Sequence, residues 1–240
     1  MNSGSRYQRF PLQIKICGLT RVEDLSWSIR SGADYLGTIL CKSPRQVSLE
    51  QAEKLLESAR EFGFASRLFA VVQDPEVEEV AALFRTGFGA IQLHGSETPE
   101  RILEIRKRFP VLRIWKGLQI LDAQDLEGLD RYPVDAILVD SKSPDGGGES
   151  SAQIQVSTAA LRKLGESVRL VLAGGLGPES VIDAVIDIEP WAIDVSSGVE
   201  SSPGIKDRKK IESFIENAKK AATLRAFAAR GGNQDQGPRA

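Results

Sequence analysis

Cys17 and Asp140 are the side chains in this sequence best placed to move protons. Each ends an apolar run, Cys17 after Ile16 and Asp140 after Val139. If the fold brings strand ends together, this thiol and this acid face one substrate. A thiolate can take a proton from carbon, and an acid with a raised pKa can deliver one to oxygen near neutrality. The pair predicts an isomerase that works by proton transfer.

The neighbours of these two residues favour chemistry over packing, although a small buried cysteine and a loop-bracing aspartate remain the alternatives. Gly18 follows Cys17, so we expect the sulfur to be open to the site. Lys15 lies two residues before Cys17, on the same inward face, where we expect its ammonium to favour the thiolate and to reach the substrate. A carboxylate at such a strand end is partly desolvated, which raises its pKa.

Two glycine-containing segments predict a phosphate site. Gly174 and Gly175 follow the seventh expected strand, and Ser196-Ser197-Gly198 follows the eighth. Barrel enzymes often bind phosphate with backbone N–H groups at these two positions, and glycine allows the backbone to come close to the oxygens. Ordinary turn glycines are the alternative. Asp194, which precedes the second segment, is expected to order these loops rather than to react.

Arg45 and His94 are the expected substrate-binding residues. Arg45 lies on the loop after the second expected strand, where it is either a solvated charge or a bidentate partner for a carboxylate. His94 ends the fourth expected strand, where it can line the pocket, donate a hydrogen bond, or act as an acid or base.

The residue counts argue against a metal site. The chain has one histidine and two cysteines, too few for a zinc site of His and Cys or for a disulfide framework. We therefore expect no zinc site of this kind, and a reducing, cytoplasmic location. Cys41 could approach Cys17, and an oxidative pairing is a hypothesis that thiol counting under mild oxidant would test.

Composition limits the class of partner. The 240 residues are 41% hydrophobic and 27% charged with a net charge of -2. This balance gives no reason to expect nucleic acid or a membrane as a partner, and no apolar run is long enough to span a bilayer. A small phosphorylated molecule is the expected ligand. The sequence leaves open whether the protein is a monomer or a homodimer.

Short β-rich runs alternate with amphipathic ones, which predicts parallel strands joined by helices. Eight such units favour an α/β fold of the (β/α)8 TIM barrel type, with an open doubly wound sheet as the competitor. The expected strands are Leu12–Cys17, Tyr35–Leu40, Arg67–Val72, Ala90–Leu93, Leu112–Lys116, Ala136–Asp140, Arg169–Ala173 and Ala192–Val195. The expected helices are Val22–Arg30, Leu49–Phe62, Pro75–Phe84, Pro99–Phe109, Ala159–Leu164, Pro178–Ile186 and Asp207–Phe227, with a weaker pattern at Ala123–Leu129.

Local signals mark the starts of several helices. Prolines at positions 75, 99 and 178 suit a first helical turn, with the preceding residues as caps, and Ser48 with Gln51 resembles a capping box. We divide the chain into an N-terminal extension (1–11), one barrel domain (12–227) and a disordered tail (228–240). Longer connections at Cys41–Val47 and Ser141–Ser157 belong on the face that carries the site.

Five motifs make the chain similar to the phosphoribosylanthranilate isomerase family of tryptophan biosynthesis. The resemblance extends in order from about Leu12 to Ala221. The motifs are Lys15-Ile16-Cys17-Gly18-Leu19-Thr20, Ser43-Pro44-Arg45, Gln92-Leu93-His94-Gly95, Leu172-Ala173-Gly174-Gly175-Leu176 and Asp194-Val195-Ser196-Ser197-Gly198-Val199-Glu200.

The resemblance implies an Amadori rearrangement that needs no cofactor. N-(5-phosphoribosyl)anthranilate becomes 1-(2-carboxyphenylamino)-1-deoxyribulose 5-phosphate, with Asp140 as general acid and Cys17 as general base. Arg45 matches the residue that binds the anthranilate carboxylate. The chain departs from the family after Asp140, where Gly146-Gly147-Gly148 is not followed by the usual Phe-Asp-Trp, and near Cys41, where an aromatic pair is replaced by a leaner segment.

Two other functions remain open at this stage. Another phosphosugar barrel, such as an indole-glycerol-phosphate synthase or a histidine-pathway isomerase, would share the phosphate loops but not the thiol at the end of strand one. A catalytically weakened binding module would fit the altered loop after Asp140, although the thiol, acid and arginine are all retained.

Overall fold

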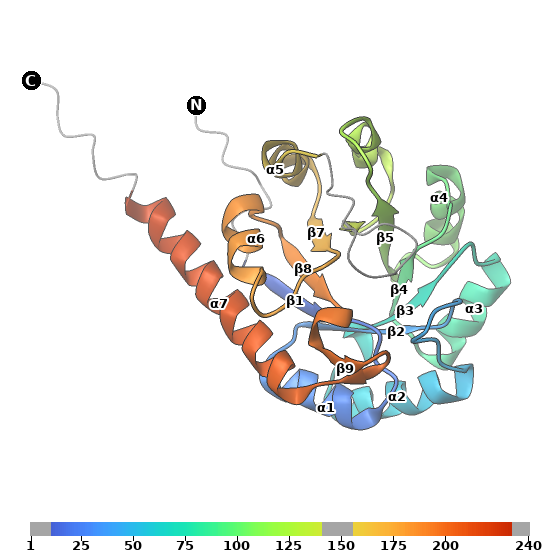
Figure 1. Cartoon of the computed structure of the whole chain (residues 1–240). Coiled ribbons are helices and arrows are strands. Elements are labelled where there is room, and N and C mark those ends of the chain that lie inside the picture. Colours follow the sequence, from blue (N-terminus) through green and yellow to red (C-terminus); the bar gives the residue numbers. More distant parts are fainter. Residues whose placement is uncertain (1–10, 141–155, 232–240) are drawn as a thin grey trace, which may run out of the picture.

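A closed barrel of eight parallel strands forms the centre of the molecule, with helices around its outside (Figure 1). The computed structural model describes residues 11–140 and 156–231. Each strand pairs with its neighbours in sequence, and β1 closes the barrel on β8. The expected (β/α)8 class is therefore confirmed. The barrel strands are β1 (Gln13–Ile16), β2 (Tyr35–Ile39), β3 (Leu68–Val72), β4 (Ala90–Leu93), β5 (Arg113–Gln119), β6 (Ala136–Asp140), β7 (Leu170–Ala173) and β8 (Ala192–Val195).

The helices agree with the sequence pattern except after β5. They are α1 (Val22–Ser31), α2 (Leu49–Glu61), α3 (Val77–Thr86), α4 (Pro99–Arg108), α5 (Thr158–Ser167), α6 (Val181–Ile188) and α7 (Arg208–Gly231). The weak pattern at Ala123–Leu129 is not an α-helix but forms two 3-10 turns, η2 (Gln124–Leu126) and η3 (Leu129–Arg131). The Asp122 and Asp125 carboxylates accept bonds from nearby backbone N–H groups there, and such bonds compete with helix formation.

Two of the four expected helix starts are confirmed. The Ser48 side chain and Gln51 form a capping box, and Thr98 caps α4 with Pro99 in its first turn. The starts at Pro75 and Pro178 are wrong, because α3 begins at Val77 and α6 at Val181. Asp74 cannot cap α3 because its φ of 46° is left-handed. Before α6, the Gly177 N–H donates to the Ser180 hydroxyl, which adds one turn ahead of the helix.

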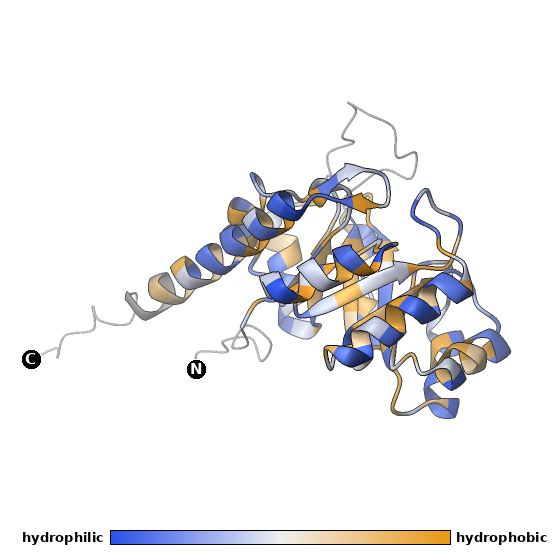
Figure 2. Ribbon diagram, turned by 90° about the horizontal axis from the view of Figure 1, so that it is seen from below, coloured by the Kyte–Doolittle hydropathy of each residue, from blue (hydrophilic) through white to orange (hydrophobic). Residues whose placement is uncertain are grey.

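Burial follows the two surfaces of the sheet. Hydrophobic residues concentrate in the strands, while hydrophobic and hydrophilic residues alternate along the helices (Figure 2). All five residues of β3 are buried, as expected for a parallel strand covered on both faces. Inside the barrel, Trp115 is the largest fully buried side chain, and Phe69 and Tyr35 pack against it at ring-centroid distances of 4.3 and 5.1 Å. Trp191 joins them at 5.7 Å from Trp115, so an aromatic layer fills the amino-terminal end of the barrel.

The last helix, α7, runs along the outside of the barrel past α6 and α1 and extends beyond it (Figure 1). Phe214 and Ala218 are fully buried, whereas Leu224 and Phe227 are 47% and 67% exposed. The helix continues to Gly231, beyond its expected end at Phe227, and the expected disordered tail (228–240) stays a prediction. Residues 232–240 lie outside the described part of the chain, and the limits of the expected domain (12–227) stay a prediction.

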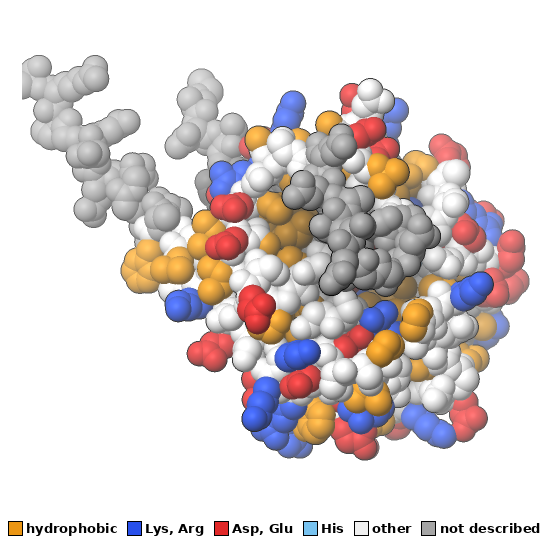
Figure 3. All heavy atoms as spheres, in the orientation of Figure 1, with side chains coloured by type: hydrophobic (Ala, Val, Ile, Leu, Met, Phe, Trp, Pro, Cys, Tyr) orange, Lys and Arg blue, Asp and Glu red, His pale blue; other side chains and the backbone are white. Residues whose placement is uncertain are grey.

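After β8, the short 3-10 turn η4 (Ser197–Val199) leads into an antiparallel hairpin of β9 (Glu200–Ser202) and β10 (Ile205–Lys206). On the surface, acidic and basic side chains intermingle on the face seen in Figure 3, in keeping with the small net charge. Within residues 11–140 and 156–231, no helix is both long enough and apolar enough to cross a membrane.

Candidate active site

The carboxyl ends of the barrel strands surround a cavity of about 280 Å³. Cys17 and Asp140 both line it, so the fold brings the thiol and the acid together although they are far apart in sequence. Most of the other expected site residues line the same cavity, namely Arg45, His94, Gly174, Gly175, Ser196 and Ser197. Lys15 and Gly198 do not.

Cys17 immediately follows β1, and its N–H donates to the carbonyl of Val195 on β8. This bond continues the barrel ladder by one residue and fixes the direction of the side chain. The residue lines the cavity, in line with the expected opening to the site, although it is only 6% exposed. Burial raises the pKa of the Cys17 thiol, and Lys15 opposes this rise without cancelling it. Ionisation of this thiol is therefore favoured by its ammonium neighbour.

Lys15 lies below the cavity rather than at its wall. Its side chain is fully buried, and Nζ lies 2.9 Å from Oδ2 of Asp194 and 5.8 Å from the centre of the Trp115 ring. Burial lowers the pKa of Lys15, but Asp194 and Cys17 outweigh burial and raise it overall. The two side chains form a buried ion pair next to Cys17. The expected roles, Lys15 in substrate binding and Asp194 in ordering the phosphate loops, stay predictions.

Gly37 on β2 makes the approach of thiol and ammonium possible. A Cβ atom at this position would lie 2.7 Å from Sγ of Cys17 and 3.1 Å from Nζ of Lys15. Contacts this short do not occur between real atoms without displacement. A glycine is therefore required here for space, and sequence reasoning missed it because nothing local marks its neighbours.

Asp140 ends β6, where it is half-buried, and His94 follows β4. Nδ1 of His94 lies 3.1 Å from the side-chain amide nitrogen of Gln92, and a Cβ at Gly117 would overlap the ring. Burial lowers the pKa of His94, which the Asp140 carboxylate only partly offsets. A neutral imidazole whose Nδ1 accepts the Gln92 amide carries its proton on Nε2. His94 is therefore a hydrogen-bond donor rather than a cation.

A second buried ion pair supports the segment that carries His94. Nζ of Lys116 lies 2.6 Å from Oε2 of Glu97, and both side chains are about 1% exposed. The same ammonium donates to the Gly95 carbonyl, and the Glu97 carboxylate accepts the N–H groups of Gly95 and Asp74. These bonds fix the turn after β4 from below.

The two expected phosphate loops meet at one end of the cavity. Gly174 and Gly175 have φ values of 86° and 67°, left-handed conformations that favour glycine. Ser196 and Ser197, on the loop after the neighbouring strand β8, line the same cavity. Gly198 has another role, because a Cβ there would overlap the Leu176 carbonyl. It lets the two loops pack against each other, and it does not line the cavity.

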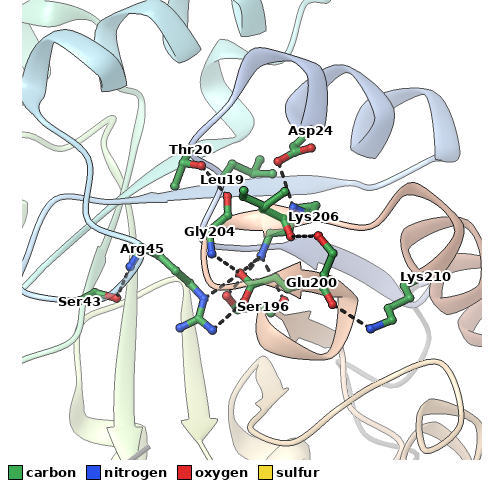
Figure 4. Close-up of polar contacts among 12 residues, drawn as sticks. Leu19, Thr20, Asp24, Ser43, Arg45, Ser196, Glu200, Gly204, Lys206 and Lys210 are labelled. Atoms are coloured by element: carbon green, nitrogen blue, oxygen red, sulfur yellow. Dashed lines mark hydrogen bonds and ion pairs between the residues drawn. The ribbon is translucent and has the colours of Figure 1, made fainter.

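Arg45 is already engaged by a carboxylate of the protein itself. Its Nε and Nη2 donate to the two oxygens of Glu200, each at 2.7 Å (Figure 4). The side edge of the guanidinium is thereby occupied. The end edge, formed by Nη1 and the second hydrogen of Nη2, still offers donors to a ligand. The sequence does not reveal Glu200 as the partner of Arg45, because 155 residues separate the two.

Two buried acceptors at the cavity wall have no hydrogen-bond partner among the described residues. They are Oε1 of Gln92 and Oδ1 of Asp194, in side chains that are 2% and 7% exposed. Buried polar atoms in native proteins are nearly always paired. Hydroxyl groups of a ligand in this cavity can donate to both acceptors.

Both cysteines are free thiols, and both line the cavity. Their oxidative pairing stays a hypothesis. In the described part of the chain, no three His, Cys, Asp or Glu side chains gather in a group that could hold a metal ion. The long loop expected at Ser141–Ser157, including its departures from the family pattern, falls almost wholly outside the described residues.

This geometry suits acid–base chemistry on an anchored sugar phosphate. The two loops after β7 and β8 can bind one anion, and the end edge of Arg45 can bind a second. The unpaired acceptors Oε1 of Gln92 and Oδ1 of Asp194 can accept hydrogen bonds from hydroxyl groups of the ligand. A thiol and a carboxyl reach into the same space. Such an arrangement can move protons between carbon and oxygen of a bound ligand.

Comparison with known proteins gives the same picture. Residues 14–217 match the family described as N-(5'phosphoribosyl)anthranilate (PRA) isomerase. The N-(5'-phosphoribosyl)anthranilate isomerase of Geobacter sp. (strain M21) is 38% identical over 210 residues, covering 87% of this chain and 98% of its own length.

Solved structures agree in fold as well as in sequence. One describes mutually generated monomers of the dimeric phosphoribosylanthranilate isomerase from Thermotoga maritima, with 34% identity and a TM-score of 0.72 over 87% of this chain and 99% of that one. Another is a phosphoribosyl anthranilate isomerase in complex with reduced 1-(o-carboxyphenylamino)-1-deoxyribulose 5-phosphate, with 33% identity and a TM-score of 0.73 over the same shares.

Proposed function

The chain belongs to the N-(5'-phosphoribosyl)anthranilate isomerase family, and we propose that Cys17 and Asp140 are the base and the acid of its reaction. The enzyme converts N-(5-phosphoribosyl)anthranilate to 1-(2-carboxyphenylamino)-1-deoxyribulose 5-phosphate in tryptophan biosynthesis. The observation that carries the assignment of residues is the single cavity shared by Cys17, Asp140 and both phosphate loops.

Ring opening comes first. Asp140 donates a proton to the ring oxygen of the ribose, the bond between this oxygen and C1 breaks, and the nitrogen lone pair of the anthranilate forms the C1=N bond. The developing alkoxide is thereby neutralised as it leaves, which is the usual contribution of a general acid. The neutral His94, close enough for the Asp140 charge to affect it, can donate a hydrogen bond in the same region.

Proton abstraction follows. The Cys17 thiolate removes the proton from C2, and the electron pair forms the C1=C2 bond as the C1=N double bond becomes single. The resulting enolamine then loses the proton of its C2 hydroxyl and gains one at C1, which yields the ketone. Lys15 stabilises the thiolate before abstraction, because it lies beneath the sulfur and is itself held by Asp194.

The remaining cavity residues bind the substrate. Backbone N–H groups of the loops containing Gly174, Gly175, Ser196 and Ser197 surround the phosphate, and the free edge of Arg45 binds the anthranilate carboxylate. Sugar hydroxyl groups donate to Oε1 of Gln92 and Oδ1 of Asp194. These assignments leave no buried acceptor at the cavity wall unpaired in the complex.

The proposal also covers the ligand, the oligomeric state and the location of the protein. A phosphorylated sugar is the partner, and neither nucleic acid nor a membrane is needed. A relative of known structure is dimeric, and either a monomer or a homodimer fits this chain. We propose a cytoplasmic location, which the small number of cysteines in the sequence supports.

Complementation of a strain that lacks this isomerase tests the function directly. The wild-type gene should restore growth without tryptophan, whereas Cys17→Ala and Asp140→Asn should not. In purified protein, we expect each variant to lower kcat by about 100-fold or more, the usual effect of losing a general acid or base.

Asp183→Asn is a matched control, because this carboxylate is exposed on α6 and does not line the cavity. It should grow and turn over substrate like wild type. Normal rates in Cys17→Ala or Asp140→Asn would refute the roles of these residues. Failure of the wild-type gene to complement would favour another phosphosugar reaction or a binding module.

A further inference from the structure

The carboxylate of Glu200 lies between the two parts of the site that bind anions. Its side chain is 5% exposed, and it contacts two cations at once (Figure 4). Arg45 takes both oxygens at 2.7 Å, and Nζ of the fully buried Lys206 lies 2.8 Å from Oε1. One carboxylate therefore fixes an arginine of the cavity wall and a lysine behind it.

Lys206 extends this connection to the phosphate loop. Its ammonium also donates to the carbonyl of Ser196 at 3.1 Å and lies 3.4 Å from the Ser196 hydroxyl. Ser196 lines the cavity, whereas Lys206 does not. Glu200 thus acts on the phosphate loop through Lys206, as it acts on the carboxylate-binding edge through Arg45.

Gly18 and the hairpin keep this network compact. A Cβ at Gly18 would lie 2.6 Å from Cδ of Arg45 and 2.7 Å from Oγ of Ser196, so the arginine and the phosphate loop meet over this glycine. From the other side, the Lys206 N–H donates to Asp24 on α1 and the Thr20 hydroxyl donates to the Gly204 carbonyl. The hairpin that carries Lys206 is therefore attached to the segment after β1.

Resting on the proposed function, we infer that Glu200 is a positioning residue that holds both anion-binding ends of the substrate site in register. It does not touch substrate, since both of its oxygens are committed to Arg45 and Lys206. It leaves the end edge of Arg45 directed at one anion and holds the Ser196 loop around the other. We expect the spacing between the two ends to suit a ligand that carries a carboxylate and a phosphate.

This inference makes a prediction opposite to simple electrostatics. Glu200→Gln removes a negative charge and leaves two cations beside the cavity, which by charge alone would strengthen anion binding. Loss of positioning would weaken it. The probe is the reduced product 1-(2-carboxyphenylamino)-1-deoxyribitol 5-phosphate, together with one analogue that lacks the ring carboxylate and one that lacks the phosphate, each titrated by calorimetry.

In wild type, removal of either group should weaken binding. In Glu200→Gln, we expect the full ligand to bind about 10- to 100-fold more weakly, the range of a charged hydrogen bond, and both truncations to cost less than in wild type. Arg45→Lys, which keeps the charge but loses the fork, should reduce only the carboxylate effect. Glu212→Gln, on an exposed pair with Arg208, should bind all three ligands like wild type.

Glu200→Asp provides a second variant in case glutamine prevents folding. It keeps the negative charge on a side chain that is one methylene shorter. The loss of affinity on removing the ligand's carboxylate or phosphate should again be smaller than in wild type, but the reduction should be less than in the glutamine variant. Unchanged or tighter binding, or a loss at one end only, would overturn the inference. If wild type neither binds the full ligand nor turns over substrate, the proposed function itself fails, which is a separate result.

Discussion

At the scale of single residues, the site depends on charged side chains that are buried in the barrel interior, where an unpaired charge would be unfavourable. Cys17 is almost completely buried, and its thiolate depends on one ammonium that is held from behind by Asp194. The sequence predicted this ammonium, because Lys15 and Cys17 are two residues apart on one strand face. It could not predict Asp194 as the partner of Lys15, since 179 residues separate the two.

Removal of the ammonium should make the thiol harder to ionise. Burial already raises the pKa of Cys17 and Lys15 opposes this effect, so Lys15→Met should raise the pKa further. In a Cys41→Ser background, Cys17 is the remaining cysteine of the chain. The pH dependence of its alkylation by iodoacetamide should then shift to higher pH, and the rise of kcat/KM with pH should shift the same way. A profile that does not move would show that Lys15 has only a structural role.

Gly37→Ala tests the space between the sulfur and the ammonium. The added Cβ would lie 2.7 Å from Sγ, so the side chains must separate. We expect kcat to fall by about 10-fold or more, with a loss of about 1–3 kcal/mol of stability from overpacking. Gly165→Ala is the matched control, because its Cβ would meet Leu170 at 3.8 Å, an ordinary contact. Equal kinetics in the two variants would contradict the proposed role of Gly37.

At the scale of elements, strand positions were predictable and loop architecture was not. Each strand lies within three residues of its expected limits, because buried parallel strands read as continuous apolar runs. The helix after β5 was wrong because aspartate side chains take over backbone N–H groups locally, which a periodicity argument does not include. The start at Pro75 was wrong because Asp74, the expected cap, has a left-handed backbone and donates its N–H to Glu97 in the next loop.

The turn after β4 depends on its buried ion pair. Glu97→Gln would leave the Lys116 ammonium as an uncompensated charge in the interior, and we expect a loss of about 3–5 kcal/mol in the free energy of unfolding, measured with urea. Glu104→Gln, in an exposed pair with Arg101, should have no measurable effect. A similar small effect at both positions would show that the Glu97 pair does not support this turn.

At the scale of the whole molecule, the helix that ends the described chain contributes unequally along its length. Phe214 is fully buried against the barrel, so Phe214→Ala should cost about 3–5 kcal/mol in thermal or urea unfolding. A chain ending at Arg225 keeps the bond from the Arg225 guanidinium to the Pro190 carbonyl, removes the exposed Phe227, and should keep both Tm and kcat close to those of the full chain. A large loss of stability on this truncation would show that the far end of α7 has a partner.

The aromatic layer of Tyr35, Phe69, Trp115 and Trp191 occupies the barrel end opposite the cavity, with the Lys15–Asp194 pair above it. Among the described residues, reactant and product must therefore enter and leave through the mouth of the cavity at the carboxyl ends of the strands. Because reactant and product occupy the same binding site, the product should be a competitive inhibitor of the forward reaction. The shared site also means that any molecule long enough to span both anion ends would block entry and exit together.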